Sequence, residues 1–179
     1  MKLIILDRDG VINHDSDAFI KTPEEWIAIP GSLEAIARLT QCGYRVVVAS
    51  NQSGIARGLL DTATFNAIND KMCKAAARVG GRIDAVFFCP HTPDAGCDCR
   101  KPAAGMFHQI AQRFSCDLRG VPAVGDSLRD LQAAVAAGAT PILVLTGKGK
   151  KTRSTGGLPD NALVFADLAS VADSLQAVT

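Results

Sequence analysis

Short, β-rich apolar runs alternate with helical stretches along this chain, and that alternation constrains the fold more than any other feature. The runs predict buried strands at residues 3–6, 44–50, 85–89, 121–124 and 141–145, with a last one at 163–165. Helices are predicted at residues 32–42, 62–79, 104–114, 128–137 and 168–177. Strands separated by helices indicate the α/β class, a Rossmann-like three-layer sandwich with a mostly parallel central sheet.

The length of the chain fits one domain. With 179 residues, about 70% of the unfolded surface can be buried on folding. We therefore expect a single domain over residues 1–179, without internal repeats or linkers. The polar segment 13–30 is long for a connection and predicts a flap or active-site loop. Ser32 is expected to cap the helix that follows it, and Gly43 to end that helix.

Charge and hydropathy exclude some classes of function. Nineteen basic and eighteen acidic residues give a net charge of +1, which argues against a general electrostatic grip on nucleic acid. No apolar run approaches the roughly 20 residues of a membrane span, and no signal-peptide pattern precedes the first strand. We expect a cytoplasmic monomer that binds neither nucleic acid nor membrane.

Polar clusters follow several of the predicted strands at the point where each strand ends. Asp7 and Asp9 follow the first strand, the segment 50–54 follows the second, and Asp126 follows the fourth. Because ligands bind at the carboxyl ends of strands in open α/β sheets, these side chains are expected to share one cleft. Adjacent carboxylates favour a divalent cation, and oxygen donors suit Mg²⁺. A polar turn after the first strand, with Gly10 at positive φ, is the alternative explanation for Asp7 and Asp9.

Three of the six cysteines and one histidine crowd into residues 89–99, namely Cys89, His91, Cys97 and Cys99. One imidazole and three thiolates match a closed tetrahedral zinc site, so a structural Zn²⁺ and a zinc-binding loop are predicted here. Reduced cysteines packed in a core are the alternative. Arg100 and Lys101 follow the last ligand directly, so the metal would fix where these two cations point.

Taken together, four motifs resemble those of the haloacid-dehalogenase-like phosphatases. The chain carries DRDG at residues 7–10, Ser50, Lys101 and GDSLRD at residues 125–130, in the order of that family. Longer segments resemble the subgroup of heptose-bisphosphate and histidinol-phosphate phosphatases: DRDGVIN, SNQSGIARG, and the two cysteine pairs followed by RKP. The chain departs from it at Val11, where Thr is usual, and at residues 15–18, which replace a loop containing Gly and Tyr.

The resemblance implies roles for the clustered residues. Asp7 would be the nucleophile that forms an aspartyl phosphate, and Asp9 the general acid and base. Ser50 and Lys101 would hold the transferring phosphoryl oxygens. Mg²⁺ would be held by Asp7, by the backbone carbonyl of Asp9 and by Asp126. The resemblance also implies little or no cap domain.

The same resemblance predicts a phosphorylated sugar as substrate, the 7-phosphate of heptose 1,7-bisphosphate in nucleotide-heptose biosynthesis. The basic segment 148–153 is either an arm for the second phosphate or a solvated charge run. Asp130 is either an orienting partner of Lys101 or a residue on the helix surface. Candidate substrate contacts are Arg8, Asp15, Ser16, Asp17, Ala18, Asn51, Gln52, Ser53, Arg57, Arg100 and Ser127.

Two other functions fit parts of the sequence. A histidinol-phosphate phosphatase would share nearly all of the motifs, but its substrate carries a cation where the heptose bisphosphate carries a second phosphate. A zinc-containing nucleic-acid-binding module would explain the cysteines and the basic segment. The near-zero net charge, an aromatic content of 5% and the clustered carboxylates argue against that module.

Overall fold

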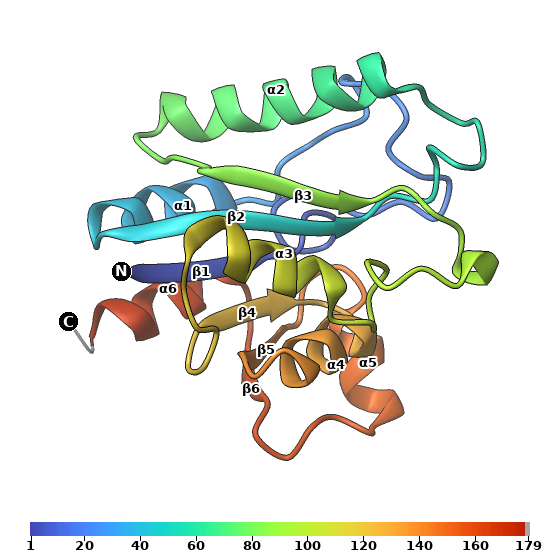
Figure 1. Ribbon diagram of the computed structural model, residues 1–179. Helices are drawn as coiled ribbons and strands as arrows, with labels where there is room; N and C mark the ends of the chain where they lie inside the picture. The colour runs from blue at the N-terminus through green and yellow to red at the C-terminus, as the bar shows by residue number, and fades with distance from the viewer. Residues whose placement is uncertain (178–179) are drawn as a thin grey trace.

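A six-stranded sheet lies at the centre of the molecule, with its strands in the order β3-β2-β1-β4-β5-β6 and every pairing parallel (Figure 1). The computed structural model describes residues 1–177, so residues 178 and 179 of the predicted domain lie outside the described residues. The strands are β1 (Lys2–Leu6), β2 (Tyr44–Asn51), β3 (Ala85–Cys89), β4 (Pro122–Gly125), β5 (Thr140–Val144) and β6 (Leu163–Phe165). The chain moves outward from β1 to β3 and then returns to β4 on the other side of β1. This switch point is where α/β sheets form ligand crevices.

Helices cover both faces of the sheet (Figure 1). Buried residues of α1 (Ser32–Gln41), α2 (Thr62–Arg78) and α6 (Leu168–Gln176) belong to one hydrophobic cluster, and those of α3 (Gly105–Phe114) and α4 (Leu128–Ala136) to another. A 3-10 turn, η1 (Pro93–Ala95), and a short helix, α5 (Gly149–Thr155), lie in the connections. The predicted α/β three-layer fold is confirmed, and the described residues contain no separate cap domain.

The two core layers follow from the alternation of side chains along β1. Ile4 and Leu6 pack into the layer beneath α1, α2 and α6, whereas Leu3 and Ile5 pack into the layer beneath α3 and α4. Successive side chains of a strand point to opposite faces, so this pattern requires apolar residues at every position of a strand covered on both sides. The same alternation decides which way the polar residues after β1 point.

One local prediction was wrong, and one helix was not predicted. Ser32 does not cap α1: Gly31 is the N-cap at φ 85°, and the buried Ser32 hydroxyl instead donates to the carbonyl of Val11 at 2.8 Å. Helix α5 was not predicted, because its sequence GKKTRST has no apolar periodicity and only Gly149 is buried. Most of the basic segment 148–153 is therefore helical.

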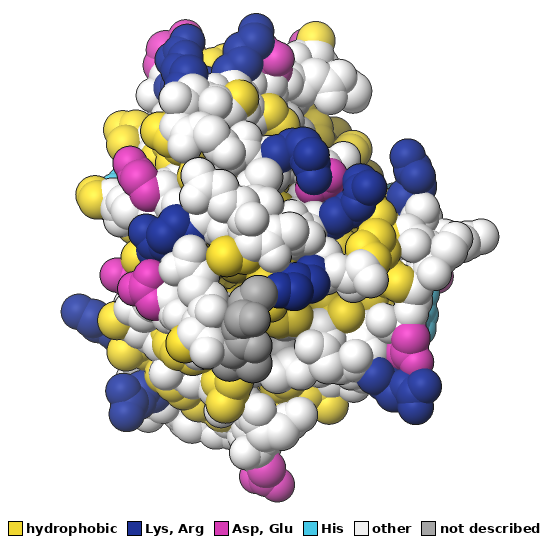
Figure 2. All heavy atoms as spheres, turned by 90° about the vertical axis from the view of Figure 1, so that its left-hand side faces the viewer, with side chains coloured by type: hydrophobic (Ala, Val, Ile, Leu, Met, Phe, Trp, Pro, Cys, Tyr) yellow, Lys and Arg dark blue, Asp and Glu magenta, His cyan; other side chains and the backbone are white. Residues whose placement is uncertain are grey.

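The surface agrees with the balanced composition. On the side where the strands begin, basic and acidic side chains are interspersed among uncharged and apolar ones (Figure 2). Within residues 1–177, no helix has both the length and the apolar character that a membrane crossing requires.

Candidate active site

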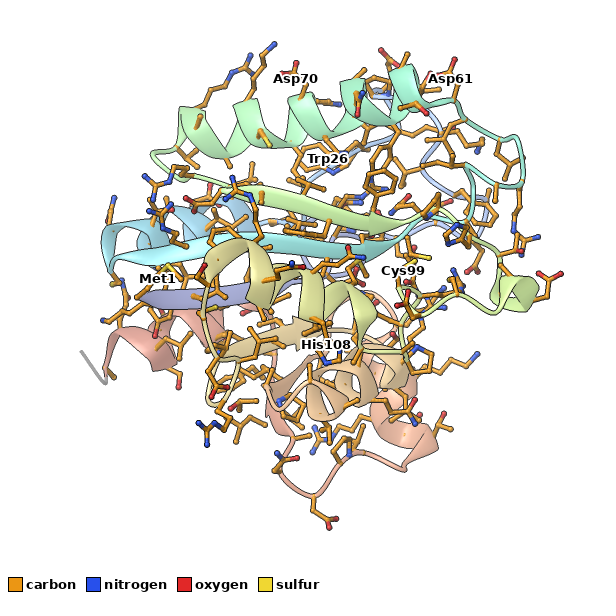
Figure 3. The ribbon with its side chains drawn as sticks, in the orientation of Figure 1. Met1, Trp26, Asp61, Asp70, Cys99 and His108 are labelled. Carbon is orange, nitrogen blue, oxygen red and sulfur yellow. The ribbon has the colours of Figure 1, made fainter. Side chains whose placement is uncertain are left out.

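A cleft of about 240 Å³ opens at the carboxyl ends of the strands. Figure 3 places Cys99 at this end of the sheet and Met1 at the opposite end. Predicted site residues that line the cleft are Asp7, Asp9, Asp15, Ser16, Asp17, Ser50, Asn51, Gln52, Ser53, Arg57, Arg100, Lys101 and Asp126. Ile20 and Arg129, which the sequence analysis did not assign to the substrate site, line the cleft too, as do Phe19, Asp130 and Lys148, the first residue of the basic segment 148–153.

Three carboxylates meet on the floor of the cleft. Oxygens of Asp7, Asp126 and Asp130, from the ends of β1 and β4 and the first turn of α4, lie within 4.8 Å of one another. Burial, opposed in part by Lys101 and reinforced by Asp130, raises the pKa of Asp7 to about 7. Burial and the charge of Asp7 raise the pKa of Asp126 to about 8. These shifts show that holding both carboxylates ionised here is costly without a cation.

Lys101 compensates part of this charge. Its buried ammonium lies 2.7 Å from Asp130 Oδ1 and 3.0 Å from Asp7 Oδ1, and it donates to the carbonyl of Ala49 at 2.8 Å. Burial by itself would raise the pKa of Asp130, but Lys101 and a hydrogen bond from Ser127 outweigh it and lower that pKa. Asp130 is therefore an orienting partner of Lys101, one of the two readings that the sequence left open.

Close packing fixes Asp126. Gly10, at φ 85°, leaves no room for a side chain, because a Cβ there would lie 2.0 Å from Asp126 Oδ2. A Cβ on Gly147, at φ 52°, would lie 2.2 Å from the same oxygen. That oxygen also accepts a hydrogen bond from the Lys148 backbone N–H at 2.7 Å. The second glycine comes from the loop after β5, so the two loops together hold the carboxylate.

This donor set fits Mg²⁺. The ligands that the structure offers are oxygens, the donors that Mg²⁺ prefers. Lys101 pairs with Oδ1 of Asp130 and Ser127 donates to its Oδ2, whereas the raised pKa values of Asp7 and Asp126 indicate that these two are the carboxylates in need of a cation. The Asp9 side chain is not part of the cluster, which leaves its backbone carbonyl as the group through which the predicted contact would be made.

Asp9 has a different environment from Asp7, two residues earlier. Its carboxylate accepts from Arg8 Nε and Nη2, both at 3.1 Å, and from the side-chain amides of Asn13 and Gln52, both at 2.8 Å. Burial would raise the pKa of Asp9, but the Arg8 charge and these hydrogen bonds outweigh it and lower the pKa. This environment therefore favours the ionised form of Asp9.

Three candidate substrate contacts do not line the cleft. Arg8 is 1% exposed and lies beneath Asp9, with its guanidinium carbon 6.0 Å from the centre of the Phe65 ring. Ser127 donates both its N–H, at 3.0 Å, and its hydroxyl, at 2.5 Å, to Asp130 Oδ2, so it caps α4. Ala18 is exposed outside the cleft. None of these three residues is therefore placed to contact a substrate in the cleft.

Two groups of charged side chains line the cleft. Arg57, Arg100 and Arg129 form one, and burial together with the charges of the other two arginines lowers the pKa of Arg100. In the other, Lys148 Nζ lies 3.1 Å from Asp15 and 3.4 Å from Asp17. No other residue of the segment 148–153 lines the cleft. One sequence signal could have identified Arg129: it lies inside the GDSLRD motif.

The side chains of the four predicted zinc ligands lie close together. Cys89 Sγ lies 3.6 Å from Cys97 Sγ and 3.2 Å from Cys99 Sγ, and His91 Nδ1 lies 3.4 to 3.5 Å from the nearer sulfurs. Tetrahedral Zn–S and Zn–N bonds imply donor separations of about 3.5 to 3.8 Å. Burial and the neighbouring thiols raise the pKa of Cys99 to about 12. Three of the four separations lie within about 0.1 Å of the range for a zinc site and the Cys89–Cys99 separation is shorter, so the cluster has about the size of a Zn²⁺ site, and Zn²⁺ favours thiolates.

The metal loop is tied directly to the cleft. Arg100 Nη1 donates to the carbonyl of His91 at 3.1 Å. Asn51 at the end of β2 accepts from the Lys101 N–H at 3.1 Å and donates to the Lys101 carbonyl at 3.0 Å. The side-chain amide of Asn51 is therefore bonded to the Lys101 backbone. These two hydrogen bonds anchor the loop between β3 and α3 to the sheet.

Comparison with known proteins identifies the family. Residues 98–171 match the HAD-hydrolase-like family model, and residues 2–129 match the model described as polynucleotide kinase 3 phosphatase. A D-glycero-β-D-manno-heptose-1,7-bisphosphate 7-phosphatase of Bordetella bronchiseptica is 66% identical over 98% of both chains. The enzyme of the same name from Pseudomonas putida is 54% identical over 98% of this chain and 99% of its own. This chain belongs to the heptose-bisphosphate 7-phosphatase family.

Solved structures of the family agree with the fold. The crystal structure of D,D-heptose 1,7-bisphosphate phosphatase from B. bronchiseptica, complexed with magnesium and phosphate, has a TM-score of 0.99, 65% identity and complete coverage of both chains. The Burkholderia thailandensis structure has a TM-score of 0.80 at 56% identity over 98% of this chain and 99% of its own. The resemblance deduced from the sequence motifs is confirmed.

Proposed function

We propose that this protein is a Mg²⁺-dependent phosphatase that removes the 7-phosphate of D-glycero-β-D-manno-heptose 1,7-bisphosphate. The observation that carries the proposal is the carboxylate cluster with its lysine, in a chain 65% identical over its full length to an enzyme whose structure holds magnesium and phosphate. The β anomer follows from the names of the relatives. An enzyme with this activity would hydrolyse a sugar phosphate in nucleotide-heptose biosynthesis.

The residues support a two-step transfer. An Asp7 oxygen attacks phosphorus, a new P–O bond forms, and the ester bond to the sugar breaks while protonated Asp9 gives its proton to the departing oxygen. Ionised Asp9 then takes a proton from water, the water oxygen attacks the same phosphorus, and the P–O bond to Asp7 breaks. Bound Mg²⁺ would offset the negative charge between Asp7 and the phosphate.

Asp9 must change protonation state in this scheme. Its pKa lies below the usual range in the ligand-free site because Arg8, Asn13 and Gln52 stabilise the carboxylate. A bound phosphate dianion places negative charge beside Asp9 and so favours the protonated form. The ionised form that Arg8, Asn13 and Gln52 favour is the one that the water-activating step needs.

Ser50 and Lys101 would hold the oxygens of the transferred group. Both are buried on the cleft floor, and the Ser50 hydroxyl accepts from Gln52 Nε2 at 2.8 Å, so its own hydrogen remains available to an anion. Lys101 supplies the positive charge next to Asp7. Donors fixed before the substrate arrives cost no reorganisation in the transition state.

The arginines of the cleft favour a second phosphate. Arg57, Arg100 and Arg129 all line it, and guanidinium groups match phosphate geometry. Histidinol phosphate would bring a cation toward these arginines, which like-charge repulsion disfavours. Asp15, Ser16 and Asp17, which also line the cleft, suit sugar hydroxyls.

Phosphate release from a panel of esters tests the proposal. The panel contains both heptose bisphosphate anomers, fructose 1,6-bisphosphate, histidinol phosphate and a 3′-phosphorylated oligonucleotide, each with and without Mg²⁺. The highest kcat/KM is expected for the β anomer and only with Mg²⁺. A preference for histidinol phosphate would move the protein to histidine synthesis, and a preference for the oligonucleotide would favour a nucleic-acid function.

We expect a monomer in the cytoplasm that acts on small molecules without a nucleic-acid partner. Light scattering checks the oligomeric state, and a titration with labelled oligonucleotides checks the partner.

A further inference from the structure

Arg8 is the largest fully buried side chain of the described residues that carries a charge. Arg8 comes two residues after Leu6, so its side chain points to the same face of the sheet as that of Leu6, the face beneath α1 and α2. Asp7 and Asp9 instead line the cleft. The guanidinium lies against the Phe65 ring of α2 and reaches back to Asp9. A charge buried this deeply is costly unless it is paired, and its partner here is Asp9.

Four hydrogen bonds hold the Asp9 carboxylate in place. Arg8 donates to both oxygens, Asn13 Nδ2 donates to Oδ1, and Gln52 Nε2 donates to Oδ2. Four donors fill the roughly four lone-pair positions of a carboxylate. Of these three residues only Gln52 lines the cleft, so its hydrogen bond is the one that a leaving oxygen can replace.

We propose that Arg8 is a positioning residue for the reaction: its buried guanidinium fork fixes the plane of the Asp9 carboxyl so that Oδ2 faces the departing sugar oxygen. Arg8 keeps both contacts while Gln52 gives up its own. The backbone adds to this arrangement, because the Arg8 carbonyl accepts from the N–H groups of Ile12 at 2.8 Å and Asn13 at 3.2 Å, which closes the turn around Asp9. This inference rests on the proposed role of Asp9 as the proton donor.

A fork is needed for this task rather than a charge alone. Arg8 Nε and Nη2 contact different oxygens of one carboxylate, and this planar two-point contact fixes an orientation. A lysine would keep the positive charge but donate from a single nitrogen. Substitution by lysine therefore separates geometry from electrostatics.

The test compares two leaving groups in wild type and in Arg8→Met and Arg8→Lys. A sugar alkoxide needs a proton to leave, whereas p-nitrophenolate leaves without one. The quantity measured is kcat/KM, which reports only the steps up to departure of the alcohol. In both variants kcat/KM for the heptose bisphosphate is expected to fall about a hundredfold, the size of a general-acid contribution, and that for p-nitrophenyl phosphate less than about fivefold.

Two controls separate positioning from loss of stability. Ile110→Ala removes a buried side chain of α3 on the other face of the sheet, so it should lower the melting temperature and leave the ratio of the two kcat/KM values unchanged. In an Asp9→Asn background, Arg8→Met should add no further loss on the sugar phosphate, because the two residues act through one step.

Equal losses on both substrates, or full activity of Arg8→Lys on the sugar phosphate, would overturn the proposal. If Arg8→Met does not fold, Arg8→Lys carries the same test, since it keeps the buried charge. If the wild-type protein hydrolyses fructose 1,6-bisphosphate but not heptose bisphosphate, the proposed substrate is refuted and the proposed role of Arg8 is not. The leaving-group comparison would then use fructose 1,6-bisphosphate with the same criteria.

Discussion

The two groups of metal-type ligands in this protein are built in opposite ways. Asp7, Asp126 and Asp130 come from separate parts of the chain and meet because the strands and helix that carry them belong to one core. Cys89, His91, Cys97 and Cys99 come from one short stretch, of which only Cys89 is buried. From this difference we expect the carboxylate cluster to need its cation for reactivity, and the thiol cluster to need its metal to hold the loop in shape.

The largest effect is expected at the carboxylate cluster. Asp126→Asn should lower kcat by about 10³-fold, because a catalytic cation supplies several kcal/mol of transition-state stabilisation. Without added metal the same variant should melt at a higher temperature than wild type, since it removes a repelling carboxylate. Kinetics and thermal melting with and without Mg²⁺ check both statements. A variant that is less stable and still active would show that Asp126 supports the fold rather than the cation.

Lys101 connects the thiol cluster to the carboxylate cluster: it lies two residues after Cys99 in the sequence, and its ammonium lies 3.0 Å from Asp7 Oδ1. Lys101→Ala should reduce kcat by on the order of a hundredfold or more, through loss of charge stabilisation of the phosphoryl oxygens. Steady-state kinetics with saturating Mg²⁺ measure the loss. Turnover near that of wild type would exclude Lys101 from the chemistry.

The thiol cluster should have a smaller, indirect effect. Cys99→Ser should lose zinc and lower kcat about 10- to 100-fold, because Arg100 and Lys101 are no longer held in place. Metal analysis should find one Zn²⁺ per wild-type chain and none in the variant, and limited proteolysis should cleave the variant within residues 89–99. Cys116→Ser, outside the loop, is the matched control and should retain zinc. Wild-type protein without zinc, purified without chelators, would contradict this assignment.

The smallest effect is a pH dependence of stability. The pKa values of Asp7 and Asp126, about 7 and about 8 in the folded protein, lie above the ordinary 3.8. Between these limits the folded protein binds more protons than the unfolded chain. The free energy of unfolding should therefore fall as the pH rises from about 4 to about 8 without Mg²⁺. Urea denaturation across this range measures the slope, which Mg²⁺ should flatten; the same slope with Mg²⁺ would argue against the ion binding here.

The sequence predicted the fold and the composition of the site because both follow from periodic patterns. Alternating strands and helices place Asp7, Ser50 and Asp126 at one edge of a parallel sheet, whatever the detailed packing. Arg8 was misassigned to the substrate although the period of two along β1 already separates it from Asp7 and Asp9. That period predicts a buried partner rather than a ligand contact.

Other features depended on contacts between distant segments. Ser32 bonds to Val11, so its hydroxyl is not available to cap α1. Arg129 and Lys148 reach the cleft only because α4 and the loop after β5 fold over the same edge. Helix α5 has no apolar period to reveal it. No local pattern encodes the outcome at Ser32 or in α5. Arg129 and Lys148 had local signals, the GDSLRD motif and the basic segment 148–153, but neither signal determines where the side chain lies in the cleft.

Trapping the covalent intermediate tests the central claim most directly. The protein is mixed with heptose bisphosphate and Mg²⁺, quenched within milliseconds and treated with borohydride, which reduces an aspartyl phosphate to homoserine. Mass spectrometry of the peptide carrying residues 7 and 9 should then find homoserine at position 7 and unmodified Asp9. Homoserine at Asp9 or Asp126, or none while phosphate is released, would contradict the assignment of Asp7 as nucleophile.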